Sequence, residues 1–560
     1  MIYPMSRHWH HEADVVVVGS GGAALAAASA AVAEGVSVIV LDAAAQPGGT
    51  TRRSGGALWI PNNSSMQGLG LTDPRQDALS LMAHLAHPSI YDPASPRFGL
   101  SQLAFDLLAA FYDHGSEVID ALTAAGAVDL IILPPLGFGT SPISDPDYHA
   151  ELPENLAPIG RVLTAISPPG SFEWPGVFLM DGLIAHVLGQ GVPILSGHRV
   201  VDVVTTGSSG EASGVVAMHE GREVNVRARR GVVFGTGGFA HDPSKVLSFV
   251  RGPLFGTGSV PTGSGVFLEV AARLGAALGN LSNGFYFQVA LEAALEAAGA
   301  ISRPDAYVFL PYGDSMIIVD KRGRRIVNEK AMYHERTQSH FVYTNDQYPN
   351  LVQIMIWDDP VMQEPTFWPW RGGVPFPGAT SPFVITGATL EELSTAIAAR
   401  LSALQGQRGI SAAVGPDVVL SPDFAANLTD TITRFDGFAT TGVDLDFHRG
   451  ETPLEPVWQG PSRGAPNRTM TPFSPVGPYY ALLLGAGVLD TCGGPVIGVN
   501  GEVLRPDGTA IPGLYGAGNC IASPTGQGYF GAGGTIGPAV VFGYLAGRAA
   551  AQRSIGRGPH

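Results

Sequence analysis

Residues 14–42, DVVVVGSGGAALAAASAAVAEGVSVIVLD, decide the fold. The four consecutive valines before Gly19 predict a short, fully buried β-strand, because such a run leaves no polar face. The alanine-rich stretch up to Ala33 predicts a helix, and residues 36–41 predict a second strand. A strand, a tight turn and a helix that leads into a second strand form a Rossmann-like βαβ unit. We therefore predict an α/β fold.

The turn after the first strand has the pattern G-x-G-x-x-A, and Asp42 ends the second strand. The glycines let the backbone approach a pyrophosphate, the small sixth residue lets the helix pack closely, and the acid can bind ribose hydroxyls. In this context the pattern predicts a dinucleotide site. Its candidate residues are Gly19, Ser20, Gly21, Gly22, Ala23, Ala24, Asp42 and Ala43.

A second loop rich in glycine and hydroxyl groups follows this acidic strand directly. A nicotinamide-binding domain usually continues here with another helix and strand, whereas a long, extended flavin cofactor needs a second set of N–H and hydroxyl donors. FAD is therefore the favoured cofactor. The candidate residues of this loop are Gly48, Gly49, Thr50, Thr51, Ser54, Gly55, Gly56 and Ala57.

Two later glycine turns predict further contacts with the cofactor. Residues 231–239 predict a strand that ends in a G-T-G-G turn, and residues 511–543 predict a strand, a glycine turn, a loop and an apolar helix. The N-terminus of that helix offers free N–H groups and a partial positive charge to an electron-rich ring. The candidates are Gly235, Thr236, Gly237, Gly518, Asn519, Gly534, Thr535 and Ile536, together with Val201, whose backbone could pair with the adenine.

Composition narrows the class of protein. The chain has 560 residues, 45% hydrophobic and 14% charged, which predicts a globular protein of two or more domains. The net charge is −16 and no basic stripe occurs, so nucleic acid is not an expected partner. The two cysteines, Cys492 and Cys520, make no disulfide framework and no metal site. Without an apolar signal segment or an apolar run of 18 residues, we expect a cytoplasmic protein, and a peripheral membrane contact stays open.

The sequence changes character near residue 285. A segment rich in proline and tryptophan, 357–382, predicts a capping loop, and an amphipathic helix is predicted over 390–404 with a capping Thr389. Near residue 480 the chain is expected to return to the nucleotide domain. We therefore predict an α/β fold (α+β overall): a discontinuous FAD-binding domain, 1–284 and 481–560, with an inserted α+β catalytic domain, 285–480.

The chain resembles the fumarate reductase/succinate dehydrogenase flavoprotein superfamily, and within it the 3-ketosteroid dehydrogenases. The resemblance covers nearly the whole chain. Besides the N-terminal fingerprint it rests on SGGALWIPNN from Ser54, GDSMIIVDKRGRRIVNE from Gly313, GPYYA from Gly477 and YFGAGGTIGPAVVFGYLAG from Tyr529. Covalently flavinylated members carry a histidine in the loop that matches residues 52–56. That loop has none here, which implies non-covalent FAD.

Three features by which fumarate reductases of the superfamily bind a dicarboxylate are absent. Tyr333 stands where their NE-x-x-x-R motif has its arginine, and Gly533–Thr535 stand where they have a second arginine in a turn. Leu489-Asp490 replace their histidine pair. A dicarboxylate without paired arginines would be bound poorly. The sequence therefore argues against fumarate or succinate chemistry.

The resemblance to the 3-ketosteroid Δ1-dehydrogenases implies the catalytic residues. Tyr333 matches the tyrosine that takes a proton from C2, while C1 gives a hydride to flavin N5. Tyr529 and Gly533 match the pair whose hydroxyl and N–H hold the C3 carbonyl and stabilise the enolate. A supporting tyrosine lies in a PDYY-like segment, which here is Pro146 to His149, so that either Tyr148 or His149 could match it, and Tyr148 is slightly favoured. This neighbour should favour the phenolate of Tyr333, since tyrosine is a poor base at neutral pH.

The expected function is FAD-dependent 1,2-desaturation of a 3-ketosteroid, with a quinone or another carrier as electron acceptor. One alternative is a Δ4-(5α)-dehydrogenase, which is less favoured because those enzymes resemble Y-x-S where this chain has Tyr529-Phe530-Gly531. Two others are a flavin-dependent reductase of another unsaturated ketone or acid, and a flavin-binding protein without turnover.

Overall fold

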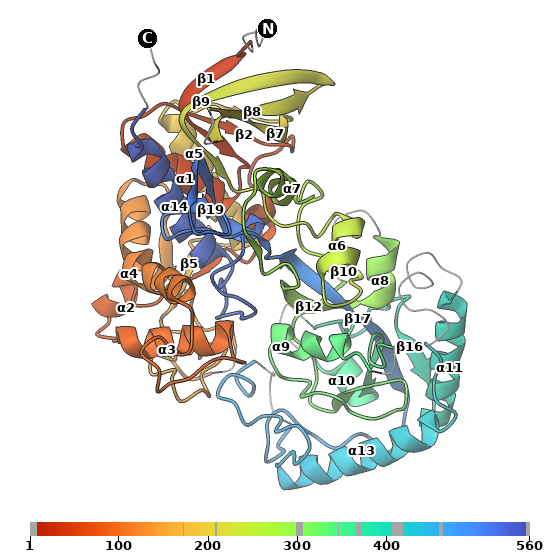
Figure 1. The fold of residues 1–560 in the computed structure, drawn as a ribbon. Coiled ribbons are helices and arrows are strands. Elements are labelled where there is room, and N and C mark those ends of the chain that lie inside the picture. The colour runs from red at the N-terminus through yellow and green to blue at the C-terminus, as the bar shows by residue number, and fades with distance from the viewer. Residues whose placement is uncertain are drawn as a thin grey trace.

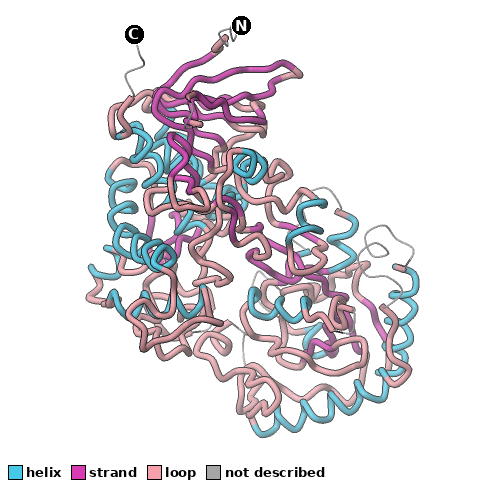
Figure 2. The backbone as a smooth tube through the Cα atoms, viewed as in Figure 1, coloured by secondary structure: helices cyan, strands magenta, loops and turns pink. Residues whose placement is uncertain are grey.

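Two large β-sheets, each with a hydrophobic core of its own, organise the chain (Figure 1). The computed structural model describes residues 8–137, 139–171, 173–207, 210–297, 306–344, 347–365, 371–405, 418–458 and 463–555. Residues 366–370 of the predicted capping loop lie outside these ranges. The first sheet lies at the top of Figure 1 and the second at the lower right, and Figure 2 shows the strands of both in magenta.

The first sheet confirms the Rossmann-like fold. Its central strands run in the order β19-β20-β9-β1-β2-β6, and β1 pairs in parallel with both β2 and β9. The βαβ unit predicted over residues 14–42 is confirmed. The elements are β1 (His11–Val18), α1 (Gly22–Ala33), β2 (Val38–Leu41), β6 (Ile194–Leu195), β9 (Arg222–Phe234), β19 (Glu502–Leu504) and β20 (Ala510–Gly516).

Helix α14 (Ile536–Gln552) packs against α1 at close range. Alanine favours the helix in α1, and its small side chains let the partner approach. Gly543 and Gly547 lie directly on the carbonyls of Ala23 and Ala27, where any Cβ would clash. This contact fixes the N-terminal end of α14 beside the fingerprint turn, although the two segments are some five hundred residues apart in sequence.

A small antiparallel meander extends the first sheet, as predicted. β7 (Arg199–Thr206) pairs with β8 (Glu211–His219), and β8 pairs with β9. The rest of this lobe contains α3 (Arg75–Ala86), α4 (Gln102–Ala124), α5 (Pro175–Gly189) and a three-stranded sheet of β3 (Ala57–Trp59), β5 (Val162–Ala165) and β4 (Leu130–Ile132). The loop that follows the acidic strand forms the 3-10 helix η1 (Thr50–Arg53).

The second sheet is built on one long strand, β17 (Tyr479–Thr491). Its side chains alternate between two cores, with Tyr479, Ala481 and Leu483 on one face and their even-numbered neighbours on the other. Both faces are covered, so the strand is apolar up to Leu489, before it ends in Asp490 and Thr491. The other strands are β10 (Gly256–Thr257), β12 (Gly284–Ala290), β13 (Tyr307–Val308), β14 (Met316–Val319), β15 (Gln353–Asp358) and β16 (Ile385–Gly387).

The helices of the second lobe include the predicted amphipathic one. α11 (Leu390–Leu404) begins after Thr389, whose hydroxyl accepts a hydrogen bond from the Glu392 N–H, which confirms the predicted cap. The remaining helices are α8 (Leu291–Glu296), α9 (Tyr333–Thr337), α10 (Asp359–Gln363) and α13 (Phe424–Thr441). Because β15 and α10 occupy residues 353–363, the segment predicted as a capping loop begins with regular structure.

The predicted division into domains at residues 284 and 480 stays a prediction. β10 and most of β17 lie outside 285–480 in sequence but belong to the second sheet. A wholly apolar strand has no polar face that would mark which sheet it joins, so the sequence gives little indication of this boundary.

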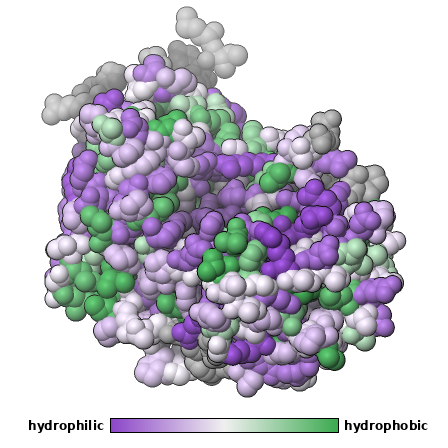
Figure 3. Space-filling view, turned by 90° about the horizontal axis from the view of Figure 1, so that it is seen from below, coloured by the Kyte–Doolittle hydropathy of each residue, from purple (hydrophilic) through white to green (hydrophobic). Residues whose placement is uncertain are grey.

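The surface bears on how the chain meets its surroundings. On the face shown in Figure 3, apolar side chains gather in several separate small groups within a largely hydrophilic surface. Apolar residues scattered in this way are ordinary for a globular protein. Within the described ranges, none of the helices is both long enough and apolar enough to cross a membrane.

Candidate active site

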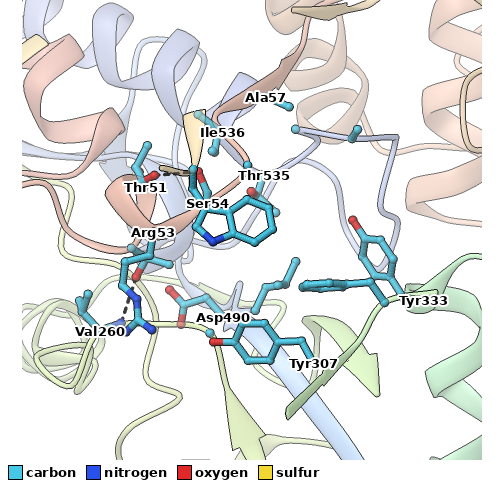
Figure 4. A pocket seen from close by; sticks show the side chains of 18 of the residues that line it. Thr51, Arg53, Ser54, Ala57, Val260, Tyr307, Tyr333, Asp490, Thr535 and Ile536 are labelled. Atoms are coloured by element: carbon cyan, nitrogen blue, oxygen red, sulfur yellow. Dashed lines mark hydrogen bonds between the residues drawn. The ribbon is translucent and has the colours of Figure 1, made fainter. Parts of the chain in front are cut away.

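A cavity of about 1000 Å³ is lined by residues from both lobes. This volume is at the upper end of the range for small-molecule sites, about 300–1,000 Å³. One part of the lining comes from the glycine turns of the first sheet. The other comes from aromatic residues, several of them in the second lobe, and Figure 4 shows members of both parts around the same space.

The fingerprint turn presents bare backbone to the cavity. Gly19 has φ +100°, and a Cβ there would clash with the Gly235 carbonyl, so only glycine keeps the two turns this close. The N-terminus of α1 begins at Gly22, whose N–H donates to Thr51 Oγ1 over 3.1 Å. A helix start of this kind attracts a phosphate group. The arrangement fits the pyrophosphate of a dinucleotide.

Asp42 lies at the end of β2, as expected for a ribose-binding acid. Its carboxylate accepts hydrogen bonds from the Ser20 hydroxyl and the Ala44 N–H, and it is 8% exposed. Burial raises the pKa of Asp42, although these hydrogen bonds oppose the shift. The Ser20 hydroxyl in turn accepts from the Gly48 N–H over 2.9 Å, which ties the second loop to the first.

The opposite wall is the start of α14 and the end of β17. Asp490, at the end of β17, accepts from the Gly238 N–H at 2.8 Å and from the Asn519 amide at 3.3 Å. Burial raises the pKa of Asp490 to about 6. Because Asp490 bonds two of the predicted cofactor turns at once, it fixes their separation.

Most of the predicted cofactor residues meet in this cavity. Those that line it are Gly19, Ser20, Gly21, Gly22, Ala23, Asp42, Gly49, Thr50, Thr51, Ser54, Gly55, Ala57, Gly235, Thr236, Gly237, Gly518, Asn519, Thr535 and Ile536. Two loops with N–H donors, a ribose-binding acid and a helix N-terminus at the far end fit an extended cofactor such as FAD.

Six predicted cofactor residues do not line the cavity: Ala24, Ala43, Gly48, Gly56, Gly534 and Val201. Ala24 is fully buried and packs directly behind Gly235. Gly56 has φ +63° and faces the backbone of Pro175. Val201 lies at an irregularity of β7, and its carbonyl accepts from Arg273 Nη2 over 3.3 Å.

Three tyrosine hydroxyls meet in the aromatic part of the cavity. The Tyr333 hydroxyl donates to the Tyr529 hydroxyl over 3.0 Å and lies 3.2 Å from the Tyr148 hydroxyl. The three residues are 5–8% exposed and come from segments far apart in sequence. The residues predicted as catalytic therefore lie together.

Gly533 adjoins the same cluster. It has φ +82°, and a Cβ there would clash with the carbonyl group of Ala57. Its N–H lies close enough to the Tyr529 hydroxyl to lower the pKa of that group, an effect that burial outweighs. Within the described residues this N–H donates to no backbone carbonyl. A hydroxyl and an N–H thus point to one region, as two donors to a single oxygen would.

The side chains of Tyr148 and His149 have different hydrogen-bond partners. His149 Nε2 lies 3.0 Å from the Tyr529 carbonyl oxygen, and its ring is also near Glu335 and Glu151. The hydroxyl beside Tyr333 belongs to Tyr148. Tyr148 is anchored by its neighbour Asp147, which accepts from Trp59 Nε1 at 2.7 Å and lies 3.5 Å from Arg161.

The electrostatic environment keeps these phenols protonated. Burial raises the pKa of Tyr529 to about 12. Burial, followed by the neighbouring tyrosines, raises the pKa of Tyr333 well above its ordinary value, and burial does the same for Tyr148. The hydrogen bond from Tyr148 was expected to favour the phenolate of Tyr333. The hydrogen bond instead raises the Tyr333 pKa, because in this geometry it favours the protonated hydroxyl of Tyr333 over its phenolate.

Several lining residues were not among the sequence candidates. They include Arg53, Leu133, Leu136, Trp174, Pro175, Tyr307, Phe309, Leu310, Trp458, Asp490 and most of 371–383. Aromatic and aliphatic residues of this kind resemble core residues in sequence, so nothing in their spacing marks them. The proline-rich segment was expected to influence access to the site, and its residues 371–376 and 379–383 do line the cavity.

Comparisons with known proteins identify the family. The model of the FAD binding domain family matches residues 14–536. The chain is 28% identical over 552 residues to 4-oxocyclohexanecarboxylate 2-dehydrogenase of Sinomonas cyclohexanicum, with 90% of this chain and 86% of that protein covered. It is 29% identical over 548 residues to 3-oxosteroid 1-dehydrogenase of Mycobacterium tuberculosis, with 88% and 90% covered.

Among solved structures, the chain is similar to 3-ketosteroid Δ1-dehydrogenase from Sterolibacterium denitrificans in complex with 1,4-androstadiene-3,17-dione. The TM-score is 0.78 at 24% identity, with 97% of this chain and 99% of that one covered. At this identity the match establishes a shared fold.

Proposed function

Because the chain belongs to the FAD binding domain family, we propose that it is an FAD-dependent oxidoreductase that removes hydrogen from C1 and C2 of a 3-ketosteroid. The cluster of Tyr148, Tyr333 and Tyr529 beside the cofactor turns is the observation that carries this proposal. Relatives named 3-oxosteroid 1-dehydrogenase support the choice of substrate. FAD, when bound, supplies the acceptor for the hydride.

In this proposal, Tyr529 and Gly533 hold the ketone. The Tyr529 hydroxyl and the Gly533 N–H lie near each other, so that one carbonyl oxygen could accept from both. Negative charge develops on that oxygen as the neighbouring carbon loses its proton. A donor placed there in a water-poor cavity stabilises the charge, and its loss typically costs about 10²–10³ in rate.

Tyr333 is the proposed base and Tyr148 its support. A protonated tyrosine cannot accept a proton from the substrate carbon, so the reactive form has to be the phenolate. The Tyr529 hydroxyl can donate to the substrate ketone while its oxygen still faces Tyr333, and the Tyr148 hydroxyl is placed to donate to the Tyr333 oxygen once Tyr333 is ionised. That donation would stabilise the phenolate. A quinone or another carrier is the proposed final acceptor of the two electrons, and FAD is proposed to be held non-covalently.

The experiment is dye-linked oxidation of 4-androstene-3,17-dione by the FAD-loaded protein. We expect a product lighter by two hydrogens, with the new double bond between C1 and C2 by proton NMR. A double bond at C4 of a saturated 3-ketosteroid would instead indicate a Δ4-(5α)-dehydrogenase, and turnover only with reduced dye would indicate a reductase. No oxidation of any 3-ketosteroid would overturn the proposal.

A monocyclic ketone is the second candidate substrate, because one relative is named for 4-oxocyclohexanecarboxylate. Abstraction of a proton next to the ketone and loss of a hydride from the adjoining carbon are the same in both rings. Comparing kcat/KM for this acid with that for the steroid decides between them.

A further inference from the structure

We propose that Arg53 binds a carboxylate of the ketone substrate, a proposal that rests on the ketone dehydrogenase function given above. Arg53 is the last residue of η1 and lines the cavity. Its Nη1 atom is buried, and none of the residues that the structure describes accepts a hydrogen bond from it. Arg53 forms no ion pair with any acid in the described ranges. A buried guanidinium nitrogen without an acceptor is costly, so we expect the acceptor to arrive with a ligand.

The adjacent arginine is a natural contrast. Arg52 Nη1 forms an ion pair with Asp181 of α5, and Arg52 does not line the cavity. Two consecutive arginines therefore have different environments, one paired with an acid outside the cavity and one facing into it without a partner. The acid nearest in Figure 4, Asp490, already accepts from Gly238, Asn519 and Thr491.

Arg53 faces the part of the cavity that we assign to the ketone. Its positive charge lowers the pKa of Tyr307, although burial raises that pKa more. The Tyr307 ring lies 5.5 Å from the Phe309 ring, which lies 5.1 Å from the Tyr333 ring. Figure 4 shows Arg53 and Tyr333 on opposite sides of the space, with Tyr307 between them at its lower edge.

This placement favours the substrate over the cofactor as the source of the anion. The pyrophosphate site at the start of α1 has donors of its own, and Gly22 reaches Thr51 there. Arg53 lines the cavity close enough to Tyr307 of the aromatic part for its charge to act on that residue. A planar guanidinium matches a carboxylate with two parallel hydrogen bonds. We infer a substrate with a ketone at one end and a carboxylate at the other.

The test compares a keto acid with its methyl ester, for example a 3-ketosteroid with a carboxylated side chain. In the FAD-loaded protein, kcat/KM should be higher for the acid. Arg53→Met should lower kcat/KM for the acid by about 10- to 100-fold, in keeping with the loss of a hydrogen bond to a charged group, and leave the ester nearly unchanged. Arg53→Lys should keep part of the preference. Arg52→Met is the matched control and should behave like the unaltered protein with both substrates.

Two results would overturn the proposal. One is an equal loss for acid and ester in Arg53→Met. The other is loss of FAD affinity in a folded Arg53→Met protein, which would assign Arg53 to the cofactor. Titration of the acid into oxidised protein, followed by the flavin absorbance change, separates the two proposals. Binding that depends on Arg53 without turnover would retain the anion site and reject the dehydrogenase, and turnover without preference for the acid would do the reverse.

Discussion

The hydroxyl of Tyr333 donates a hydrogen bond to the hydroxyl of Tyr529 over 3.0 Å, although 196 positions separate them in sequence and both side chains are buried. One comes from the start of α9 in the second lobe and the other from the loop before α14 in the first. This hydrogen bond between the lobes thus joins the proposed base, Tyr333, to the proposed ketone donor, Tyr529. Each of the two residues can be replaced separately.

Replacing either hydroxyl should abolish most of the activity. We expect Tyr529→Phe to lower kcat by about 10²–10³ through loss of one donor to the enolate oxygen. Tyr333→Phe should cost about 10²–10⁴ as the base is lost. Both should keep FAD, as measured by flavin absorbance after gel filtration. Tyr480→Phe, which loses a hydroxyl bonded to Asp359 outside the cavity, is the control. Full activity in Tyr333→Phe would exclude it as the base.

The rate should rise steadily with pH. Burial holds the pKa of Tyr333 well above its ordinary value of 10.0, so the phenolate fraction grows about tenfold per pH unit throughout the neutral range. We expect kcat/KM to increase without a plateau below pH 10. The measurement is a pH profile with a neutral ketone, so that the substrate does not titrate. Because kcat/KM reports the pKa values of the free protein, a plateau near pH 7 would contradict a raised pKa of Tyr333.

Gly533→Ala should be more harmful than a glycine substitution elsewhere. A non-glycine residue at φ +82° costs about 1–2 kcal/mol, and the added Cβ also strikes the Ala57 carbonyl. We expect loss of the ketone donor, with kcat/KM down at least about 10²-fold. Gly35→Ala is the control, since Gly35 has φ +76° but open space around its Cβ position. A similar loss of activity in the two variants would contradict the proposed role of Gly533 as a donor to the ketone.

Asp490 should make stability depend on pH. Its folded pKa of about 6 lies above the ordinary value of 3.8, so the fold prefers the protonated form. Its contribution to the free energy of unfolding therefore falls as pH rises from about 4 to about 6, by about 3 kcal/mol at most. Asp490→Asn lacks this titration. The Tm of the variant relative to the unaltered protein should increase over that interval, with FAD in excess throughout. A Tm difference independent of pH would contradict the assignment.

Local patterns predicted the nucleotide-binding lobe and the start of α11 well, because their signals are contiguous. The turn at Gly19, the acid at Asp42 and the cap at Thr389 each depend on residues close in sequence. The tyrosine cluster could not be derived in this way. Tyr148, Tyr333 and Tyr529 meet only through tertiary structure, and the family resemblance alone indicated them.

Other features depend on orientations that the sequence does not encode locally. Nothing in the pair Arg52-Arg53 indicates which side chain enters the cavity, since the one acid that distinguishes them, Asp181, is in α5. The choice between Tyr148 and His149 likewise depends on the direction of one loop. The effect of Tyr148 on the pKa of Tyr333 also differs from expectation, because it depends on the relative orientation of two hydroxyls that meet only in the folded protein.

The long strand β17 has a mechanical consequence. Its first half is paired with β15 and β16 inside the second lobe, and its last two residues, Asp490 and Thr491, bind the Gly238 and Phe239 N–H groups of the first. The strand therefore connects the two lobes, by strand pairing at one end and by hydrogen bonds at the other, and restricts their relative motion. Opening of the lobes about a hinge would break these hydrogen bonds. We therefore expect the two lobes to move as a single rigid unit, and a bulky ketone to enter by local displacement of residues at the rim of the cavity.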